Sequence, residues 1–410
     1  MKQADEVGNE VGDPLAPWTL EDSGFAAIDT LFRSPAFAPH TGTTCQAEDQ
    51  AEREQLFIAA MAESYAYHQA NSLEYRGHVA LDTNAPQQLA SMADVEQIPW
   101  MFVQNFKEAE LTSVPADEVE IVLTSSGTSG SQTKTFLDHT SLNRLQVAGY
   151  EVYKGLDIVK NAASACNYLM FTYDIAEMPN LGTAWTDVYI AQMVKANEMV
   201  FLIRKKTPDA PMEFDLELAI ETYQRFAASG LPLRILGFPA FMYHTFMAAQ
   251  QRGIASLSPE AARDSWVLTG GGWKNHKGEV IGKRDFAQFI QTSTGVPVSQ
   301  VRDLFGMAEH GIGYVDCEHG RLHVPLYAHA VTRDPMTLKI QPPGTCGILQ
   351  LFTPLLKSSP ALSLLTTDEV ILHAEPCACG RSGMGLEYVG RLGLTQYEGC
   401  AIRALEYLKT

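Results

Sequence analysis

Beyond residue 118, short apolar runs alternate with longer stretches of mixed polarity, and this pattern predicts alternating strands and helices. Strands are expected at residues 120–123, 233–236, 266–268, 301–304, 347–352 and 370–372. Helices are expected at residues 47–69, 215–228 and 241–251, and Gly230 is placed to end the second of them as a C-cap. The first residues, up to about residue 40, are irregular and rich in Pro and Ala.

This alternation indicates an α/β fold with mixed, largely parallel sheets and flanking helices. In such sheets ligands bind beyond the carboxyl ends of the strands. Glycine-rich segments fall at such ends, because residues 270–272 follow the strand expected at 266–268 and Gly306 closely follows the one at 301–304. A length of 410 residues fits one large domain or two to three ordinary ones.

The composition is that of a globular protein, with 46% apolar and 19% charged residues and a net charge of −18. Such an acidic chain is unsuited to non-specific binding of nucleic acid or anionic membranes. No run of 18 apolar residues is present, and the polar N-terminal sequence is not that of a signal peptide. The seven cysteines are an odd number in a long chain. We therefore expect a cytoplasmic protein with reduced thiols and no nucleic-acid or membrane partner.

The sequence IVLTSSGTSGSQTK, residues 121–134, carries a run of small and hydroxylated residues directly after an expected strand. Glycines allow backbone N–H groups to approach an anion closely, and hydroxyl groups add further donors. Phosphate is the natural ligand, and Lys134 would add a positive charge. The spacing is not that of a Walker A loop. The alternative is a flexible Ser/Gly linker.

Five segments in order resemble motifs of the adenylate-forming superfamily of acyl-CoA synthetases and luciferases. They are LTSSGTSG after the first strand, TGGGWK at 269–274, DLFGMAEHG at 303–311, LLTTDEV at 364–370, and the pair CACGR and VGRLG near the end. The sequence is most similar to the phenylacetate-CoA ligase branch and, within it, to the acyl-protein synthetase (LuxE-type) family. The resemblance spans roughly residues 90–402, and the order of the motifs makes it specific.

The resemblance implies an enzyme that joins a carboxylic acid to AMP as a mixed anhydride, using ATP and Mg²⁺. Phosphate binding is then expected from Thr124, Ser125, Ser126, Gly127, Thr128, Ser129 and Gly130, and adenosine binding from Gly270, Gly271, Gly272, Phe305, Gly306, Asp368 and Arg391. Glu309 would bind Mg²⁺, and Lys134 would assist catalysis. Taken singly, Glu309 could instead be a helix-start carboxylate, Asp368 a turn residue and Phe305 a core residue.

The sequence departs from the superfamily pattern in two respects. Only 19 residues follow Arg391, so the small C-terminal domain with its catalytic lysine is expected to be missing, and Lys134 lies one position later than the usual loop lysine. The expected division is an N-terminal segment at 1–90, the adenylate-forming core at 91–388 and a remnant at 389–410. Acyl-protein synthetases share this truncation and pass the acyl group to a cysteine near the C-terminus, which corresponds to Cys400 here. The alternative for Cys400 is a small buried side chain.

Cysteines and histidines late in the chain suggest a structural zinc site. Three thiolates and one imidazole form a closed tetrahedral set, and the favoured ligands are Cys317, His323, Cys377 and Cys379. His319 is a reserve ligand, because residues 317, 319 and 323 share one face of an extended segment. The alternative is a group of thiols in surface loops. His310 is placed either to contact the substrate carboxylate or to pack in the core.

The sequence therefore predicts an ATP-dependent enzyme that activates a carboxylic acid, with fatty acids favoured, and transfers the acyl group to a protein thiol and on to a partner such as a reductase. One alternative is a CoA ligase or biosynthetic adenylating enzyme that delivers to an amine or carrier protein. Another is a non-catalytic adenylate-binding protein. Tyr173 and residues 238–242 are candidates for lining the acyl pocket.

Overall fold

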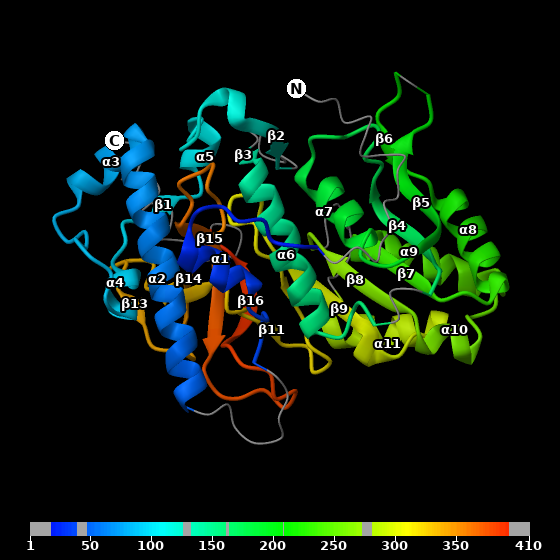
Figure 1. Ribbon diagram of the computed structural model, residues 1–410. Helices are drawn as coiled ribbons and strands as arrows, with labels where there is room; N and C mark the ends of the chain where they lie inside the picture. Colours follow the sequence, from blue (N-terminus) through cyan, green and yellow to red (C-terminus); the bar gives the residue numbers. More distant parts are fainter. Residues whose placement is uncertain are drawn as a thin grey trace. The chain divides into compact units, whose positions relative to one another are not determined.

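The computed structural model describes residues 18–38, 47–125, 133–160, 164–207, 209–272 and 281–392 (Figure 1). Its contacts divide the chain into two compact units. The first unit contains Leu156–Phe305 and Val315–Gly320, and the second contains Thr19–Gly155, Gly306–Tyr314 and the chain from Arg321 onward. This division does not test the domain boundaries expected at residues 90 and 388, which stay predictions.

The first unit is built on a seven-stranded sheet of order β10-β9-β8-β7-β4-β5-β6. Strands β4, β5, β7, β8 and β9 are paired in parallel, and β6 adds to the edge in antiparallel sense. The strands are β4 Cys166–Tyr173, β5 Ala196–Lys205, β6 Met212–Phe214, β7 Leu233–Gly237, β8 Trp266–Gly270, β9 Val301–Phe305 and β10 Tyr314–Val315. The helices are α7 Gly182–Ala191, α8 Leu216–Ser229, α9 Pro239–Gln251, α10 Pro259–Arg263 and α11 Lys283–Thr294, with a 3₁₀ turn at Val298–Gln300.

Helix α8 shows why local sequence signals locate its ends. Asp215 accepts a hydrogen bond from the backbone N–H of Leu218 at 3.1 Å, which is an N-cap, and Gly230 ends the helix with φ of 74°. The helix expected at 215–228 is thus confirmed. Its apolar face and that of α9 pack on the parallel strands in one continuous core, which includes Leu169, Phe226 and Phe246.

The second unit contains a seven-stranded sheet of order β11-β16-β15-β14-β12-β13, with β1 paired in parallel to β15. The other pairs of this sheet are antiparallel. Its strands are β1 Met101–Phe102, β11 Leu322–His323, β12 His329–Arg333, β13 Ile340–Gln341, β14 Cys346–Phe352, β15 Ser363–His373 and β16 Gly385–Arg391. The helices of this unit are α1 Ala26–Arg33, α2 Ala47–Asn71, α3 Leu73–Leu81, α4 Met92–Glu96, α5 Asn105–Glu108 and α6 His139–Gly155.

A separate antiparallel pair joins β2, Val119–Thr124, to β3, Lys134–Asp138, after a 3₁₀ turn at Ala116–Glu118. The strand expected before the Ser/Gly loop therefore exists, and it pairs with the strand that follows the loop rather than with the parallel sheet. The α/β class and the mixed sheets are confirmed. Parallel pairing is concentrated in the first unit because helices connect its strands, whereas shorter connections join β14, β15 and β16. None of the described helices has the length and apolar character needed to cross a membrane.

Candidate functional site

In the first unit, two of the expected nucleotide-binding segments meet at the carboxyl edge of the parallel sheet. Gly270 ends β8 and pairs in register with Leu304, the residue before Phe305 at the end of β9. The hydroxyl of Thr269 donates to Asp303 Oδ1 at 2.8 Å, which ties the two segments together. Gly271 and Gly272 follow with φ of 69° and 67°, a left-handed conformation that favours glycine. Phe305 is half-buried rather than a core residue.

The Ser/Gly loop of the second unit connects the antiparallel strands β2 and β3. Thr124 and Lys134 are register partners, Ser125 N–H donates to the Thr133 carbonyl at 3.1 Å, and Thr133 N–H donates to Ser125 Oγ at 3.0 Å. These bonds fix both ends of the loop. Ser126, Gly127, Thr128, Ser129 and Gly130 lie outside the described residues.

Glu309 lies in a turn between β9 and β10, not at the start of a helix. The N–H groups of His310 and Gly311 both donate to the Met307 carbonyl, at 3.2 and 3.0 Å, and Gly311 has φ of 78°. A side chain at Gly311 would collide with Leu355, so the turn requires glycine. The turn holds the Glu309 carboxyl 95% buried within the second unit.

The pKa of Glu309 depends on its burial and on several nearby side chains, one of which is the expected site residue Asp368. Burial raises the pKa of Glu309 above its ordinary value, and the charge of Asp368 adds to that rise. Three groups lower it: first the backbone N–H of Glu309 itself, then the neighbouring Thr133 hydroxyl, which lies close but outside ordinary hydrogen-bond geometry, and then the charge of Lys107. Because the net pKa is still raised, these groups do not fully offset the burial of the carboxylate, as expected for a group that binds a cation.

Asp368 and Arg391 are register partners on β15 and β16. Arg391 Nε donates to Asp368 Oδ1 at 3.0 Å, and the Asp368 N–H donates to Thr366 Oγ1 at 3.0 Å. Burial raises the pKa of Asp368 while Arg391 opposes the rise. Asp368 is thus a buried strand residue rather than a turn residue, and Arg391 holds its carboxyl in place.

Lys134 forms an ion pair in the structure, which does not test the catalytic role expected for it. Lys134 is half-exposed and forms an ion pair with Glu110 at 2.7 Å. Lys107, on the four-residue helix α5, is instead the lysine whose charge affects the pKa of Glu309. Sequence reasoning missed both Lys107 and Thr133, since neither lies in a motif that marks it. A catalytic role for Lys134 stays a prediction.

His310 is fully buried next to Glu309. Its Nε2 lies 2.7 Å from the Tyr314 hydroxyl, and the two rings are stacked within 8° of parallel. Burial lowers the pKa of His310 to about 3, so the imidazole is neutral at pH 7. This packing favours the structural role of the two considered for His310.

The four expected zinc ligands come together. The Sγ atoms of Cys317, Cys377 and Cys379 and a ring nitrogen of His323 all lie within 4.8 Å of one another. Cys379 Sγ is 3.2 Å from His323 Nε2, and none of the five cysteines in the described ranges forms a disulfide. Gly320, with φ of 75°, donates to the Cys317 carbonyl in a turn, so residues 317–323 are not extended and His319 is exposed instead.

The expected roles of Cys400 and of the acyl-pocket residues are not tested by the structure. Cys400 lies outside the described residues. Of the candidates for the acyl pocket, Phe238 and Met242 are buried in the core of the first unit, and the Tyr173 ring packs edge-on against Phe238 with centroids 5.8 Å apart. The lining of an acyl pocket therefore stays a prediction.

Comparison with known proteins identifies a family and two relatives in sequence. The family model described as "Acyl-protein synthetase, LuxE" matches residues 44–408. A long-chain-fatty-acid–luciferin-component ligase of Vibrio harveyi is 27% identical over 86% of this chain and 88% of its own length. A ligase of the same name from Aliivibrio fischeri is 24% identical over the same shares.

Solved structures agree on the fold. A 2-hydroxyisobutyryl-CoA ligase, crystallised with 2-HIB-AMP and CoA, superposes with a TM-score of 0.65 at 17% identity, over 86% of this chain and 72% of that one. The same ligase in its postadenylation state gives a TM-score of 0.64 at 16% identity. The fold is thus that of adenylate-forming ligases.

Proposed function

The chain belongs to the LuxE family of acyl-protein synthetases, and on that basis we propose that it activates a fatty acid with ATP and transfers the acyl group to a protein thiol. The names of the Vibrio and Aliivibrio relatives support a long-chain fatty acid as the substrate and a component of a luciferin system as the partner. The single observation that carries the proposal is the joint burial of Glu309 and Asp368, held by Arg391, beside the anchored ends of the Ser/Gly loop.

The first half-reaction forms an acyl-adenylate. A carboxylate oxygen of the fatty acid attacks the α-phosphorus of ATP, the bond from that phosphorus to the bridging oxygen breaks, and pyrophosphate leaves. The chain must position two anions and neutralise their charge rather than supply a covalent group. The loop from Ser125 to Gly130 is proposed to bind the phosphates through the Ser125 hydroxyl and the backbone N–H groups of residues 126–130, with Lys107 or Lys134 adding positive charge nearby.

Mg²⁺ fits the carboxyl group of Glu309. The pKa of this carboxyl group is raised by burial and by the charge of Asp368. A divalent cation would offset both effects because it favours the ionised carboxylate. Oxygen donors are the ligands that Mg²⁺ prefers. When bound, the ion would neutralise charge on the phosphate oxygens. Glu309 itself would hold that ion in place, and it must be ionised to do so.

Each unit, taken by itself, contains residues for which a role in adenosine binding is proposed. Asp368 would accept from the ribose hydroxyls through the oxygen that Arg391 does not engage, and Phe305 would pack on the adenine beside Gly270 to Gly272. The register pairing of Gly270 with Leu304 and of Asp368 with Arg391 supports these roles within each unit.

Zinc fits the group formed by Cys317, His323, Cys377 and Cys379. Two ligand atoms that share a tetrahedral zinc at about 2.0 to 2.3 Å are separated by about 3.5 Å. The 3.2 Å from Cys379 Sγ to His323 Nε2 is close to that value. With four protein ligands and no open position, the metal would stabilise the fold and take no part in catalysis.

In the second half-reaction the thiolate of Cys400 is proposed to attack the acyl carbonyl, so that a thioester forms and AMP leaves. A thiolate is a strong nucleophile, and a thioester stays reactive enough to pass the acyl group to a partner, for which a reductase is the expected class. A reduced, cytoplasmic setting belongs to the same proposal, supported by the odd number of cysteines and the charge of −18.

The proposed adenylation is tested by ATP–pyrophosphate exchange with a panel of carboxylic acids of increasing chain length. Exchange that depends on a long-chain fatty acid, and that proceeds without coenzyme A, is expected. Absence of exchange with every acid would favour the non-catalytic alternative. Product formation that requires coenzyme A would favour the CoA-ligase alternative.

A further inference from the structure

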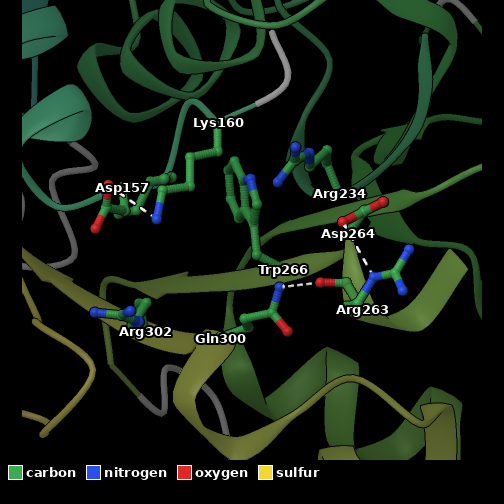
Figure 2. A pocket seen from close by; sticks show the side chains of 9 residues that line it. Asp157, Lys160, Arg234, Arg263, Asp264, Trp266, Gln300 and Arg302 are labelled. Atoms are coloured by element: carbon green, nitrogen blue, oxygen red, sulfur yellow. Dashed lines mark hydrogen bonds and ion pairs between the residues drawn. The ribbon is translucent and has the colours of Figure 1, made fainter. Parts of the chain in front are cut away.

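A small cavity of about 120 Å³ lies at the amino end of the parallel strands of the first unit (Figure 2). Arg234 is the second residue of β7, Trp266 the first of β8 and Arg302 the second of β9. The complete lining is Asp157, Ile158, Lys160, Arg234, Arg263, Asp264, Trp266, Gln300 and Arg302. Four cations and two carboxylates therefore face the cavity, a local positive excess in a chain of net charge −18.

This cavity is separate from the proposed nucleotide site. Strand β8 runs from Trp266 at the cavity to Gly270 at the carboxyl edge of the sheet. Four steps along a strand span about 13 Å. A ligand in the cavity would thus lie at the opposite edge of the sheet from Phe305 and Gly270, where ligands of such sheets ordinarily bind.

Arg234 is the central group of the cavity. Its side chain is 96% buried, its Nε has no hydrogen-bond partner, and among the described residues no carboxylate oxygen lies within 4.0 Å of its guanidinium. The guanidinium carbon lies 5.0 Å from the centroid of the Trp266 ring, so one face is covered by the indole. A buried cation that stacks but lacks an anion is costly unless a ligand supplies the charge.

Neighbouring groups do not supply that charge. Burial raises the pKa of Cys166 and of Tyr168, the residues beside Arg234 on β4, so both stay neutral at pH 7. The indole Nε1 of Trp266 is also buried without a partner and is a second donor at the cavity wall. Both unpartnered donors come from residues that line one small space.

The other cations complete the wall. Arg302 is held by bonds from its Nε to the Ser299 carbonyl and from its Nη1 to the Asp316 carbonyl. In Figure 2 the Trp266 ring lies between the side chains of Lys160 and Arg234. Lys160 is largely exposed and pairs with Asp157 at 3.1 Å, and Arg263 contacts Asp264 only at 3.8 Å. Exposed pairs of this kind are weak and can exchange partners at little cost.

We propose that this cavity binds a small oxyanion of the phosphate class. Arg234 and Trp266 would donate from the buried side, and Lys160 and Arg263 from the rim. Charge-assisted hydrogen bonds from guanidinium groups are among the strongest that proteins make to phosphate. A space of about 120 Å³ is several times the volume of a water molecule and accommodates a single phosphate group.

Calorimetric titration with inorganic phosphate tests the proposal, with saturating AMP present so that the proposed nucleotide site is occupied. One phosphate is expected to bind to the full-length protein with a dissociation constant below about 10 mM. Arg234→Gln should weaken binding at least about tenfold, as loss of a charge-assisted hydrogen bond implies. The double variant Lys160→Gln/Arg263→Gln alters only rim side chains, so it should fold normally and weaken binding to a similar extent.

The matched control is Arg204→Gln, which removes an exposed arginine from β5 of the same sheet and should leave phosphate binding unchanged. Absence of phosphate binding to the unaltered protein would overturn the proposal. So would equal binding by the double variant and the control, because the cavity cations would then make no contribution.

Discussion

Replacement of Glu309 by Gln distinguishes a cation-binding role of this carboxylate from a structural role. The substitution keeps the shape of the side chain and removes its charge. Because Glu309 is 95% buried, the lost charge acts in a site that water screens poorly. Removal of one such electrostatic contact costs about 3 kcal/mol in the transition state, which is a rate reduction of 10²- to 10³-fold.

The same substitution should not destabilise the fold. Burial raises the pKa of Glu309 in the folded protein, so the folded state favours the protonated form. The contribution of Glu309 to the free energy of unfolding is fully present below the pKa that its carboxyl group has in the unfolded protein. It is lost as the pH rises through the pKa of that group in the folded protein. At pH 8 the folded protein carries the cost of a buried carboxylate, and Glu309→Gln removes that cost. The melting temperature of the variant should therefore equal or exceed that of the unaltered protein at pH 8, with the difference shrinking as the pH falls.

Two assays measure these effects on one preparation. Fatty-acid-dependent pyrophosphate exchange reports the rate, and thermal unfolding between pH 5 and pH 8 without nucleotide reports stability. Glu74→Gln is the control, because Glu74 is an exposed residue of α3. A nearly normal exchange rate in Glu309→Gln would refute the cation-binding role. A melting temperature well below that of the control would show that the carboxylate stabilises the fold instead.

Two other predictions concern neighbouring groups. Asp368→Asn should raise KM for ATP by about tenfold, which is a loss of about 1.4 kcal/mol of binding free energy, with a smaller change in kcat. The reason is that the substitution weakens a ribose contact made in both the ground and the transition state. An unchanged KM in steady-state kinetics would exclude that contact. Purified protein should hold about one equivalent of zinc by elemental analysis. Cys379→Ser should lower both zinc content and melting temperature, whereas His319→Ala should change neither, and a zinc-free protein of full stability would remove the site.

Features with local causes were predicted well from the sequence. Asp215 and Gly230 mark the ends of α8 because a cap is formed within one turn of the helix. The strands at β7 and β8 were also located, since each is a short and mainly apolar run that ends at glycine. Strand β9 contains Arg302 and Asp303, and it was located as the segment that leads into Phe305 and Gly306. Their order in the parallel sheet follows from pairing between distant segments, which no single run encodes.

Features that depend on distant partners were not predicted. The hairpin of β2 and β3 requires the strand after the Ser/Gly loop to pair back on the one before it, and β3 alone has no signal of that choice. Lys107 contributes to the surroundings of Glu309 from a position about 200 residues earlier in the chain. His323 was correctly favoured over His319, but residue parity gave no reason for that choice, and the turn at Gly320 breaks the extended segment that parity assumes.

The motif residues were predicted only in part from the sequence. The order of the five motifs indicated the family, and Glu309, Asp368 and Arg391 do come together in the second unit. Sequence could not show that Arg391 is the register partner of Asp368, or that Lys134 pairs with Glu110. The first fact depends on the backbone register of two strands and the second on side-chain geometry, and residue type alone determines neither.

The central claim is that the acyl group passes from the adenylate to a thiol of this chain. Intact-protein mass spectrometry after incubation with ATP, Mg²⁺ and a long-chain fatty acid tests it most directly, with Cys400→Ser as the variant and Cys346→Ser, an exposed thiol elsewhere, as the control. The unaltered protein and Cys346→Ser should gain one acyl mass that hydroxylamine removes, and Cys400→Ser should release pyrophosphate but gain no such mass. An unmodified wild-type protein under conditions of active pyrophosphate exchange, or a Cys400→Ser variant acylated like the wild type, would contradict the account.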